Sequence, residues 1–390
     1  MSAEPLRPLL LLAGAGFVSG ASMRVAEPLL PLLAQDFGGT VRHAAIVLAA
    51  FTFAYGAFQI VHGPLGDRVG KLRLVTVALV LAAIASFGCA VAETLNILAV
   101  ARFLTGLFSG AVIPLSLAWI GDRVPYEGRQ AVLGRFIAGT LLGQSFGPLL
   151  GGVLSDLFGW RATFVAMGIA FLVICALLVP EARMTGRPPP MDRPSPWRQY
   201  LEILRSPRAR PVLATVGIEG FLFFGAFGFV GAYLHERFGL SFSLTGLLIA
   251  GFGVGGVLYS FAVRRLVASL GETGLVAAGG GTLLACFAGM AWAPTWPIAA
   301  PFIVVLGFGF YMLHNTLQVR ATEMAPAARG AGVSFFAFSL FLGQAAGVSI
   351  FGWVIEQFGY RGPMLFAGVA LCLLAWAFRQ RLFLLRAASH

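Results

Sequence analysis

Apolar residues dominate this chain in long runs, and short polar segments separate one run from the next. A run of about 20 apolar residues is long enough to cross the hydrocarbon core of a bilayer as a helix. On this criterion the sequence predicts twelve membrane-spanning helices, at residues 8–33, 44–62, 72–92, 95–120, 132–154, 162–180, 211–234, 242–263, 273–292, 297–319, 330–354 and 363–383. The predicted fold class is therefore an all-α membrane protein.

Composition agrees with this pattern. Of the 390 residues, 58% are hydrophobic and only 11% are charged, whereas soluble domains carry about 25% charged residues. So small a polar surface excludes a soluble enzyme and a disordered chain. The net charge of +11 would suit a nucleic-acid-binding protein, but basic residues also collect in the cytoplasmic loops of membrane proteins. We therefore expect a lipid bilayer, and no nucleic acid, as a partner.

The distribution of basic residues predicts the orientation. With the N-terminus placed in the cytoplasm, 20 of the 27 Lys and Arg residues fall in inner segments and 3 within helices. The outer loops contain only Arg42, Arg161, Arg237 and Arg361. Because positive charge favours the cytoplasmic side, the sequence predicts a multi-pass protein of the inner (cell) membrane with both termini in the cytoplasm.

The two halves of the chain repeat each other. A proline-rich and charged segment divides the sequence into residues 1–180, a cytoplasmic linker at 181–210, and residues 211–390. A shift of 200 residues superposes identical residues at Leu142, Gly143, Gln144, Gly147, Gly152, Phe158, Gly159, Arg161, Gly168 and Ala170. Six helices in each half give both copies the same orientation, which predicts a substrate site between them.

Three motifs point to one family. The segment after the second predicted helix reads GPLGDRVGKLR, from Gly63 to Arg73, and the fourth helix reads RFLTGLFSG from Arg102. The fifth helix reads GQSFGPLLGG, from Gly143 to Gly152. The first resembles the loop signature of the major facilitator superfamily, and the third resembles its antiporter motif. The resemblance covers nearly the whole chain and implies a twelve-span drug:proton antiporter built from two pseudo-symmetric six-helix bundles.

The loop signature predicts a gate. Its glycines would allow a tight loop, and Asp67 places an anion where a helix N-terminus of the other half could meet it, a contact worth up to about 2 kcal/mol. An ordinary charged loop is the alternative. The second-half copy has Ala268 in place of this aspartate, which implies an asymmetric gate. The predicted gating residues are Gly63, Asp67, Arg68, Gly70, Lys71 and Arg73.

The antiporter motif has a physical interpretation of its own. Gly143, Gly147 and Gly151 lie four residues apart and so share one helix face, which permits close packing against another helix. Pro148 removes a backbone hydrogen bond and favours a kink, and Gly152 closes the motif. The helix could serve packing alone, or it could also take part in coupling or in preventing leaks.

Ionisable residues within membrane helices are costly and are functional by default. Arg24 and Glu27 share a helix face, and Arg102 lies at a similar depth, so the three could form one cluster. That cluster could be a structural ion network, a site for an anionic substrate group or a protonation site. The two arginines would keep Glu27 ionised, which makes it a poor proton carrier unless the cluster opens.

Glu219 is the only acidic residue within a predicted helix of the second half. It lies roughly 12 Å from the cytoplasmic end, and burial away from an arginine would favour its protonated form. It is therefore a candidate proton-coupling residue, with Glu27 as the second. On the tenth helix a polar stripe, which could line the substrate cavity with Arg24 and Arg102, consists of Tyr311, His314, Asn315 and Gln318. Glu219 and His314 could be neighbours, or His314 and Asn315 could satisfy one another.

These observations predict a secondary active transporter that exports a small molecule in exchange for protons and acts as a monomer. The runner-up is a proton-coupled importer or facilitator of a small metabolite, and a transporter-like receptor or lipid-translocating scaffold is a more distant alternative. The chain has no G-x-x-x-x-G-K-[ST] loop for ATP, and its four cysteines each stand alone. The sequence therefore predicts no cofactor, no metal and no enzymatic activity, and it leaves the substrate open.

Overall fold

The computed structural model describes residues 6–185, 196–325 and 329–387, and these residues form a bundle of α-helices. The first half contains α1 (Leu6–Arg24), the short 3-10 helix η1 (Glu27–Leu29), α2 (Leu30–Asp36), α3 (Val41–Ala44), α4 (Ile46–Ala57), α5 (Gln59–Val69), α6 (Lys71–Ala90), α7 (Leu95–Ser109), α8 (Val112–Arg123), α9 (Tyr126–Phe158) and α10 (Trp160–Met184). A linker helix, α11 (Pro196–Arg205), leads to the second half. That half contains α12 (Ala209–Phe227), α13 (Val230–Phe238), α14 (Phe242–Trp292), α15 (Trp296–Glu323), α16 (Arg329–Phe358) and α17 (Arg361–Ala387).

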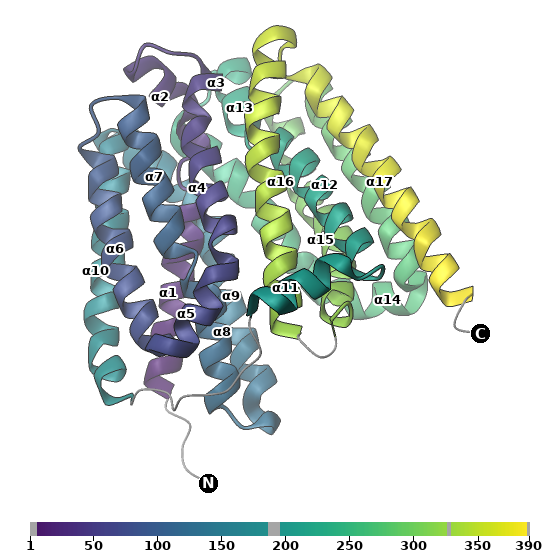
Figure 1. Cartoon of the computed structure of the whole chain (residues 1–390). Helices are drawn as coiled ribbons and strands as arrows, with labels where there is room; N and C mark the ends of the chain where they lie inside the picture. Colours follow the sequence, from purple (N-terminus) through teal and green to yellow (C-terminus); the bar gives the residue numbers. More distant parts are fainter. Residues whose placement is uncertain (1–5, 186–195, 326–328, 388–390) are drawn as a thin grey trace.

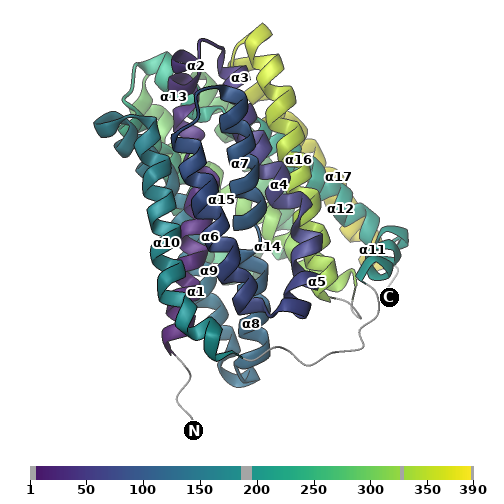
Figure 2. The same ribbon diagram turned by 60° about the vertical axis from the view of Figure 1, so that its left-hand side comes forward.

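The two halves stand side by side, and α1 begins and α17 ends at the same end of the bundle (Figure 1). We call this the terminal end, and the opposite end, which carries α2, α3 and α13, the distal end (Figures 1 and 2). Helix α9 packs on α14 and α4 packs on α16, so these two helix pairs join the halves.

The prediction of twelve spans is confirmed when the long helix α14 is counted as two spans and the bent pair α3–α4 with α5 is counted as one. In the described part of the chain, ten helical segments are long and apolar enough to cross a bilayer, and the pair α3–α4 with α5, bent by 49°, adds one more. Gly271, with φ of 64°, interrupts the 51-residue α14 and divides it into two spans. The chain is therefore a multi-pass membrane protein.

Several spans are broken, which their apolar composition did not predict. The first span changes from α1 to η1 after Arg24, the fourth breaks at Gly110 between α7 and α8, and the seventh breaks at Gly228 between α12 and α13. Broken helices expose backbone polar groups, which a membrane protein tolerates only where the protein or a cavity satisfies them. These breaks therefore mark the interior of the bundle and not its lipid-facing surface.

The sequence repeat corresponds to a repeated helix contact. A Cβ built on Gly143 would meet the backbone oxygen of Phe17, and one built on Gly343 would meet that of Gly217. Both residues of the second contact lie 200 positions after those of the first. Gly147 and Gly347 repeat the same relation one turn further along, against Ala21 and Phe221. The glycines of the antiporter motif thus bring α9 against α1 as predicted, and α16 packs on α12 in the same way.

Polar contacts close the boundary between the halves at the distal end. Asp156 on α9 accepts hydrogen bonds from the backbone N–H groups of Phe242 and Ser243, at 3.2 and 2.7 Å. Arg42 on α3 forms an ion pair of 2.8 Å with Glu356 on α16. Gly152, the last residue of the antiporter motif, faces the backbone of Phe242. The two halves are therefore in tight contact at the end away from the termini.

Towards the terminal end, α9 and α14 lose the close contact that they make at the distal end. A Cβ on Gly134 of α9 would meet nothing within 4 Å, and Val257, Leu258 and Phe261 of α14 are exposed, the last to 81%. The tight contact between these helices ends near Ser145, which faces Gly253. Along α9 and α14 the boundary between the halves is thus closed at the distal end and open towards the termini.

The linker at 181–210 was predicted as a loop, but part of it is helical. The proline-rich stretch at 187–195 lies outside the described residues, while α11 follows it and contacts both α12 and α16 at the terminal end (Figures 1 and 2). Tyr200 on α11 donates a hydrogen bond of 3.2 Å to the backbone oxygen of Ile60 on α5 and packs on Phe335. Helix α11 therefore bridges the two halves.

Candidate functional site

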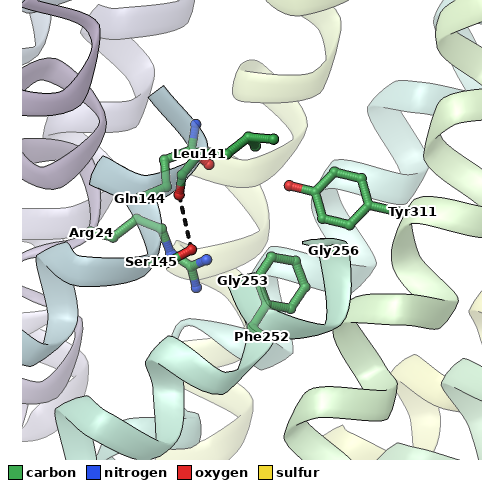
Figure 3. Close-up of a pocket in the computed structure, with 8 residues that line it drawn as sticks. All are labelled: Arg24, Leu141, Gln144, Ser145, Phe252, Gly253, Gly256 and Tyr311. Atoms are coloured by element: carbon green, nitrogen blue, oxygen red, sulfur yellow. Dashed lines mark hydrogen bonds between the residues drawn. The ribbon is translucent and has the colours of Figure 1, made fainter. Parts of the chain in front are cut away.

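A small pocket lies between the halves where their tight distal contact ends (Figure 3). Arg24 reaches it from α1 and Tyr311 from α15, with Phe252 of α14 beside them (Figure 3). Both halves contribute further lining residues: Leu141, Gln144, Ser145, Gly253 and Gly256. A pocket formed jointly by two repeats is the expected place for a substrate site in a transporter of this architecture.

Arg24 and Glu27 form the pair that the sequence predicted. Two hydrogen bonds of 2.9 Å join Nε and Nη2 of the guanidinium to the two carboxylate oxygens, and both side chains are buried. The guanidinium carbon also lies 4.9 Å from the ring centres of both Phe227 and Phe252 in the second half. Arg24 thus links α1 to both its own carboxylate partner and the aromatic residues across the boundary.

The prediction that Arg102 joins this pair is wrong. Its Nη1 donates to the backbone oxygen of Ser22 at 3.0 Å, and its guanidinium lies 4.1 Å from the ring centre of Phe51. Nε and Nη2 have no hydrogen-bond partner among the described residues, although the side chain is fully buried. The prediction rested on helix depth, and depth does not determine which way a side chain turns.

Glu219 and His314 lie next to each other in the second half. The Nδ1 atom of His314 is 2.8 Å from Oε2 of Glu219, which is completely buried. The other carboxylate oxygen, Oε1, has no hydrogen-bond partner among the described residues. Phe310 stacks on the imidazole at 4.9 Å, and Phe336 covers another side at 5.5 Å. The histidine is therefore the partner of Glu219, in an otherwise aromatic environment.

The polar stripe of α15 divides into two faces. His314 turns inward to Glu219, so the alternative in which His314 and Asn315 satisfy one another is wrong. The side chain of Asn315 lies near the Tyr259 hydroxyl of α14 instead. Tyr311 lines the pocket, and Gln318 is exposed further towards the terminal end.

The loop signature forms a much tighter connection than predicted. Helix α5 continues to Val69 and α6 begins at Lys71, so only Gly70, with φ of 104°, forms the turn. Gly63 and Gly66 are helical, and Gly66 lies against Leu115 of α8. A short connection between two helices fixes their relative position better than a flexible loop would.

Lys71 of this signature lies between two carboxylates. Its Nζ lies 3.3 Å from Oδ1 of Asp67 and forms a second ion pair with Asp122 on α8. Arg68 is exposed and Arg73 half-buried. In the described residues the signature therefore ties α5, α6 and α8 of the first half together at the terminal end.

Sequence reasoning missed the aromatic and distal contacts of the site. Phe252 and Phe227 could not be singled out among 35 phenylalanines, because apolar composition does not reveal which rings face a cation. Asp156 gave a weak signal, since its repeat counterpart at 356 is also acidic. The sequence did not indicate that Asp156 and Glu356 both contact the other half, which the structure shows.

Comparison with known proteins identifies the family. Residues 12–339 match the family model described as "Major Facilitator Superfamily". An uncharacterized MFS-type transporter of Bacillus subtilis is 26% identical over 369 residues, which cover 91% of this chain and 87% of the relative. The inner membrane transport protein YnfM of Escherichia coli is 28% identical over 240 residues, 60% of this chain and 56% of the relative.

Two further matches are a relative whose name states a compound and a solved structure that shares the fold. A probable actinorhodin transporter of Streptomyces coelicolor is 34% identical over 178 residues, 44% of this chain and 30% of the relative. The crystal structure of a bacterial homologue of the human lysosomal transporter Spinster, in an inward-facing and unoccupied conformation, superposes with a TM-score of 0.70 at 18% identity. That alignment covers 97% of this chain and 93% of the other, and it shows a shared fold.

Proposed function

The chain belongs to the Major Facilitator Superfamily, and we propose that it exports a small molecule across the cell membrane in exchange for protons. Membership of this family makes it a transporter and not an enzyme. The export direction rests on the antiporter motif that packs α9 against α1. The use of protons rests on the pair formed by Glu219 and His314.

The Glu219–His314 contact is the observation that carries the proposal. The carboxylate and the imidazole lie 2.8 Å apart, close enough for one proton to be held between them. With one proton the pair is neutral overall, as carboxylate and imidazolium or as carboxyl and imidazole. Losing that proton leaves a buried negative charge, and gaining a second leaves a buried positive one, and both are unfavourable in an apolar environment. A conformational change that alters access or solvation at the pair would therefore take up or release a proton.

The structure corresponds to one state of an alternating-access cycle in this proposal. The count of basic residues supports a cytoplasmic position for the terminal end, and in that orientation a boundary open towards the termini is the inward-facing state. Asp156 and the Arg42–Glu356 pair close the outer side in this state. Asp67 and Lys71 would form the inner gate, which closes when the outer side opens.

The pocket beside Arg24 is the proposed substrate site. Nη1 of Arg24 is not used by the Glu27 carboxylate, and the hydroxyl of Tyr311 points into the same space (Figure 3). Phe252 offers an aromatic face beside these donors. The arrangement suits an amphipathic molecule with an aromatic ring and an acceptor group, and actinorhodin, named for one relative, is the first compound to test.

The proposed unit is a monomer of two bundles, at residues 1–180 and 211–390, joined by the linker at 181–210. Protons and one small molecule are its expected transported partners. Each bundle would move largely as a rigid body around the pocket, while α11 bridges them on the cytoplasmic side.

A thermal-shift screen of the detergent-purified protein identifies compounds that bind, with actinorhodin, drugs, sugars, amino acids and organic acids as the panel, and transport assays then test the hits. Proteoliposomes then compare the parent with Glu219→Gln. The variant should lose uphill transport driven by a proton gradient but retain downhill exchange, because the amide mimics a permanently protonated carboxyl. Unchanged uphill transport in this variant would refute coupling through Glu219, and uphill uptake in the direction of proton flow would identify an importer.

A further inference from the structure

Helix α11 has an apolar side that neither half of the protein covers. Tyr200 and Ile203 are buried, and the helix packs on α12 and α16. Trp197, Leu201 and Leu204, in contrast, are 59%, 46% and 45% exposed. These three residues are four and three positions apart and therefore share one face of the helix. The helix thus has two apolar faces, and only one of them packs on the described part of the protein.

Arginines border the exposed apolar face. Arg198 and Arg205 stand three residues before and four residues after Leu201, so both are its neighbours on the helix surface, and both are exposed. The segment 196–210 contains four arginines against one acidic residue, Glu202, and so has a net charge of +3. This combination suits a partner that is apolar in one part and anionic in another.

Three kinds of side chain divide the surface of α11 into three faces. Successive helical residues are about 100° apart. The buried face with Tyr200 and Ile203 therefore lies about 100° from the exposed apolar face centred near Leu201, and the charged face with Arg198 and Arg205 lies about 100° beyond that. A helix that lies at the bilayer surface beside a membrane protein has its neighbours in this order: protein, hydrocarbon and water.

The position of α11 agrees with such a location. The helix runs across the spans at the terminal end (Figure 1) and lies at the side of the bundle (Figure 2). The Tyr200 hydroxyl donates to the backbone oxygen of Ile60, nine residues before α5 ends at Val69. Helix α11 therefore lies beside the spans and not beyond their ends, where an exposed apolar face meets lipid.

We propose that α11 lies in the headgroup region of the leaflet at the terminal end and binds anionic phospholipids there. Tryptophan is enriched at this level of a membrane. An apolar face with arginines beside it is typical of helices that lie in the interface. The guanidinium groups of Arg198 and Arg205 are well suited to phosphate oxygens, while the apolar face would enter the acyl chains.

Two other partners fit these observations less well. A zwitterionic lipid would cover the apolar face but would leave the net charge of +3 without a counter-charge. A soluble protein would have to enter the lipid beside the bundle in order to reach Leu201. An anionic phospholipid satisfies both the apolar and the charged face, whatever compound the protein transports.

The depth of α11 is measured on the full-length protein in nanodiscs of phosphatidylcholine and phosphatidylglycerol. A nitroxide is attached at Leu201→Cys, and Glu202→Cys on the charged face is the matched control. Cys372→Ser in both proteins leaves only buried native cysteines. The label at 201 should collide mainly with oxygen, which concentrates in lipid, and the label at 202 mainly with a water-soluble nickel chelate. Equal access of the chelate to both labels would overturn the membrane contact.

The choice of lipid is measured with a fluorophore at Leu201→Cys. The quencher is brominated phosphatidylglycerol or brominated phosphatidylcholine at equal mole fraction, and phosphatidylglycerol should quench more strongly. Arg205→Gln should reduce this preference about fivefold, as expected for one arginine at an anionic surface. Arg264→Gln, which replaces an exposed arginine of α14, should leave the preference unchanged.

Both arginine variants replace exposed side chains, so neither removes packing from the core. Equal quenching by the two lipids in the parent would overturn anionic lipid as the partner of α11. An equal loss of preference in Arg205→Gln and Arg264→Gln would indicate attraction by the net charge of the whole protein and would overturn α11 as the binding surface.

Discussion

The carboxylate of Asp156 on α9 lies at the first turn of α14 and accepts a hydrogen bond of 2.7 Å from the backbone N–H of Ser243. One half of the protein thus provides a cap for a helix of the other half. A carboxylate at a helix N-terminus is worth about 0.5–2 kcal/mol. This contact is lost whenever the distal end opens, so it contributes directly to the balance between the two states.

Asp156→Ala should therefore shift the protein towards the distal-open state. At about 1 kcal/mol the ratio of the two states changes about fivefold. Spin labels at Gln35 and Gln357, exposed distal residues of the two halves, report the separation. Asp36→Ala is the matched control, because the hydrogen bonds of Asp36 lie within its own half, to Trp160 and Arg161, in the part of the chain that the structure describes. Identical distance distributions in both variants would argue against a latch at Asp156.

Glu27→Gln should destabilise the protein, since it leaves the buried Arg24 without its carboxylate partner. Removing one member of a buried ion pair costs about 3–5 kcal/mol, which thermal unfolding in detergent would detect. The added change Arg24→Gln should restore most of the loss, whereas Arg102→Gln should add a loss of its own. Additive effects of Glu27→Gln and Arg24→Gln would show that the pair contributes no coupling energy.

Gly147→Ala should lower stability and transport because its Cβ would meet the backbone oxygen of Ala21 at 2.5 Å. Gly134→Ala on the same helix has open space around it and should be neutral or stabilising by up to about 1 kcal/mol. Unfolding temperature and transport rate measured on both variants separate close packing from helix propensity. A Gly147→Ala protein as stable and active as Gly134→Ala would contradict the packing role of the motif.

Asp67→Asn should reduce transport about 5- to 30-fold, the range expected from losing about 1–2 kcal/mol at a charged gate. Expression should remain near normal, because Asp67 is half-exposed and fills no core space. Transport is compared at matched protein amounts with Glu93→Gln, which removes an exposed carboxylate from the α6–α7 loop. A transport rate of Asp67→Asn equal to that of the parent would contradict a gating role for this residue.

Much of the fold could be predicted because it depends on averages along the chain. Long apolar runs and the repeat of Gly143 and Gly147 at Gly343 and Gly347 are both one-dimensional signals. The breaks at Gly110 and Gly228 were not predicted, since a glycine inside an apolar run is compatible with a continuous helix.

The site was predicted in part, for a related reason. The spacing of Arg24 and Glu27 determines their contact within one helix, and depth brought Glu219 and His314 to the same level. Arg102 has a similar depth to Arg24, yet it turns to the backbone of Ser22. Which neighbour a side chain meets depends on helix rotation and packing, and a hydropathy pattern does not contain that information.

Substrate binding itself should depend on pH. If substrate and proton exclude one another, lowering the pH should protonate the Glu219–His314 pair and weaken binding by the parent. Glu219→Gln should bind with the same affinity at every pH, as measured by fluorescence or calorimetry with the compound found in the thermal-shift screen. Glu93→Gln, which alters an exposed carboxylate in the α6–α7 loop, should retain the dependence of the parent.

The most direct test of coupling is the release of protons from the detergent-solubilised protein when that same compound is added in a weakly buffered solution. The parent and Glu93→Gln should release protons in proportion to the compound bound, because binding displaces the proton shared by Glu219 and His314. Glu219→Gln should bind the compound and release none. Undiminished release from Glu219→Gln would contradict the account and make Glu27 the leading candidate for the coupling residue.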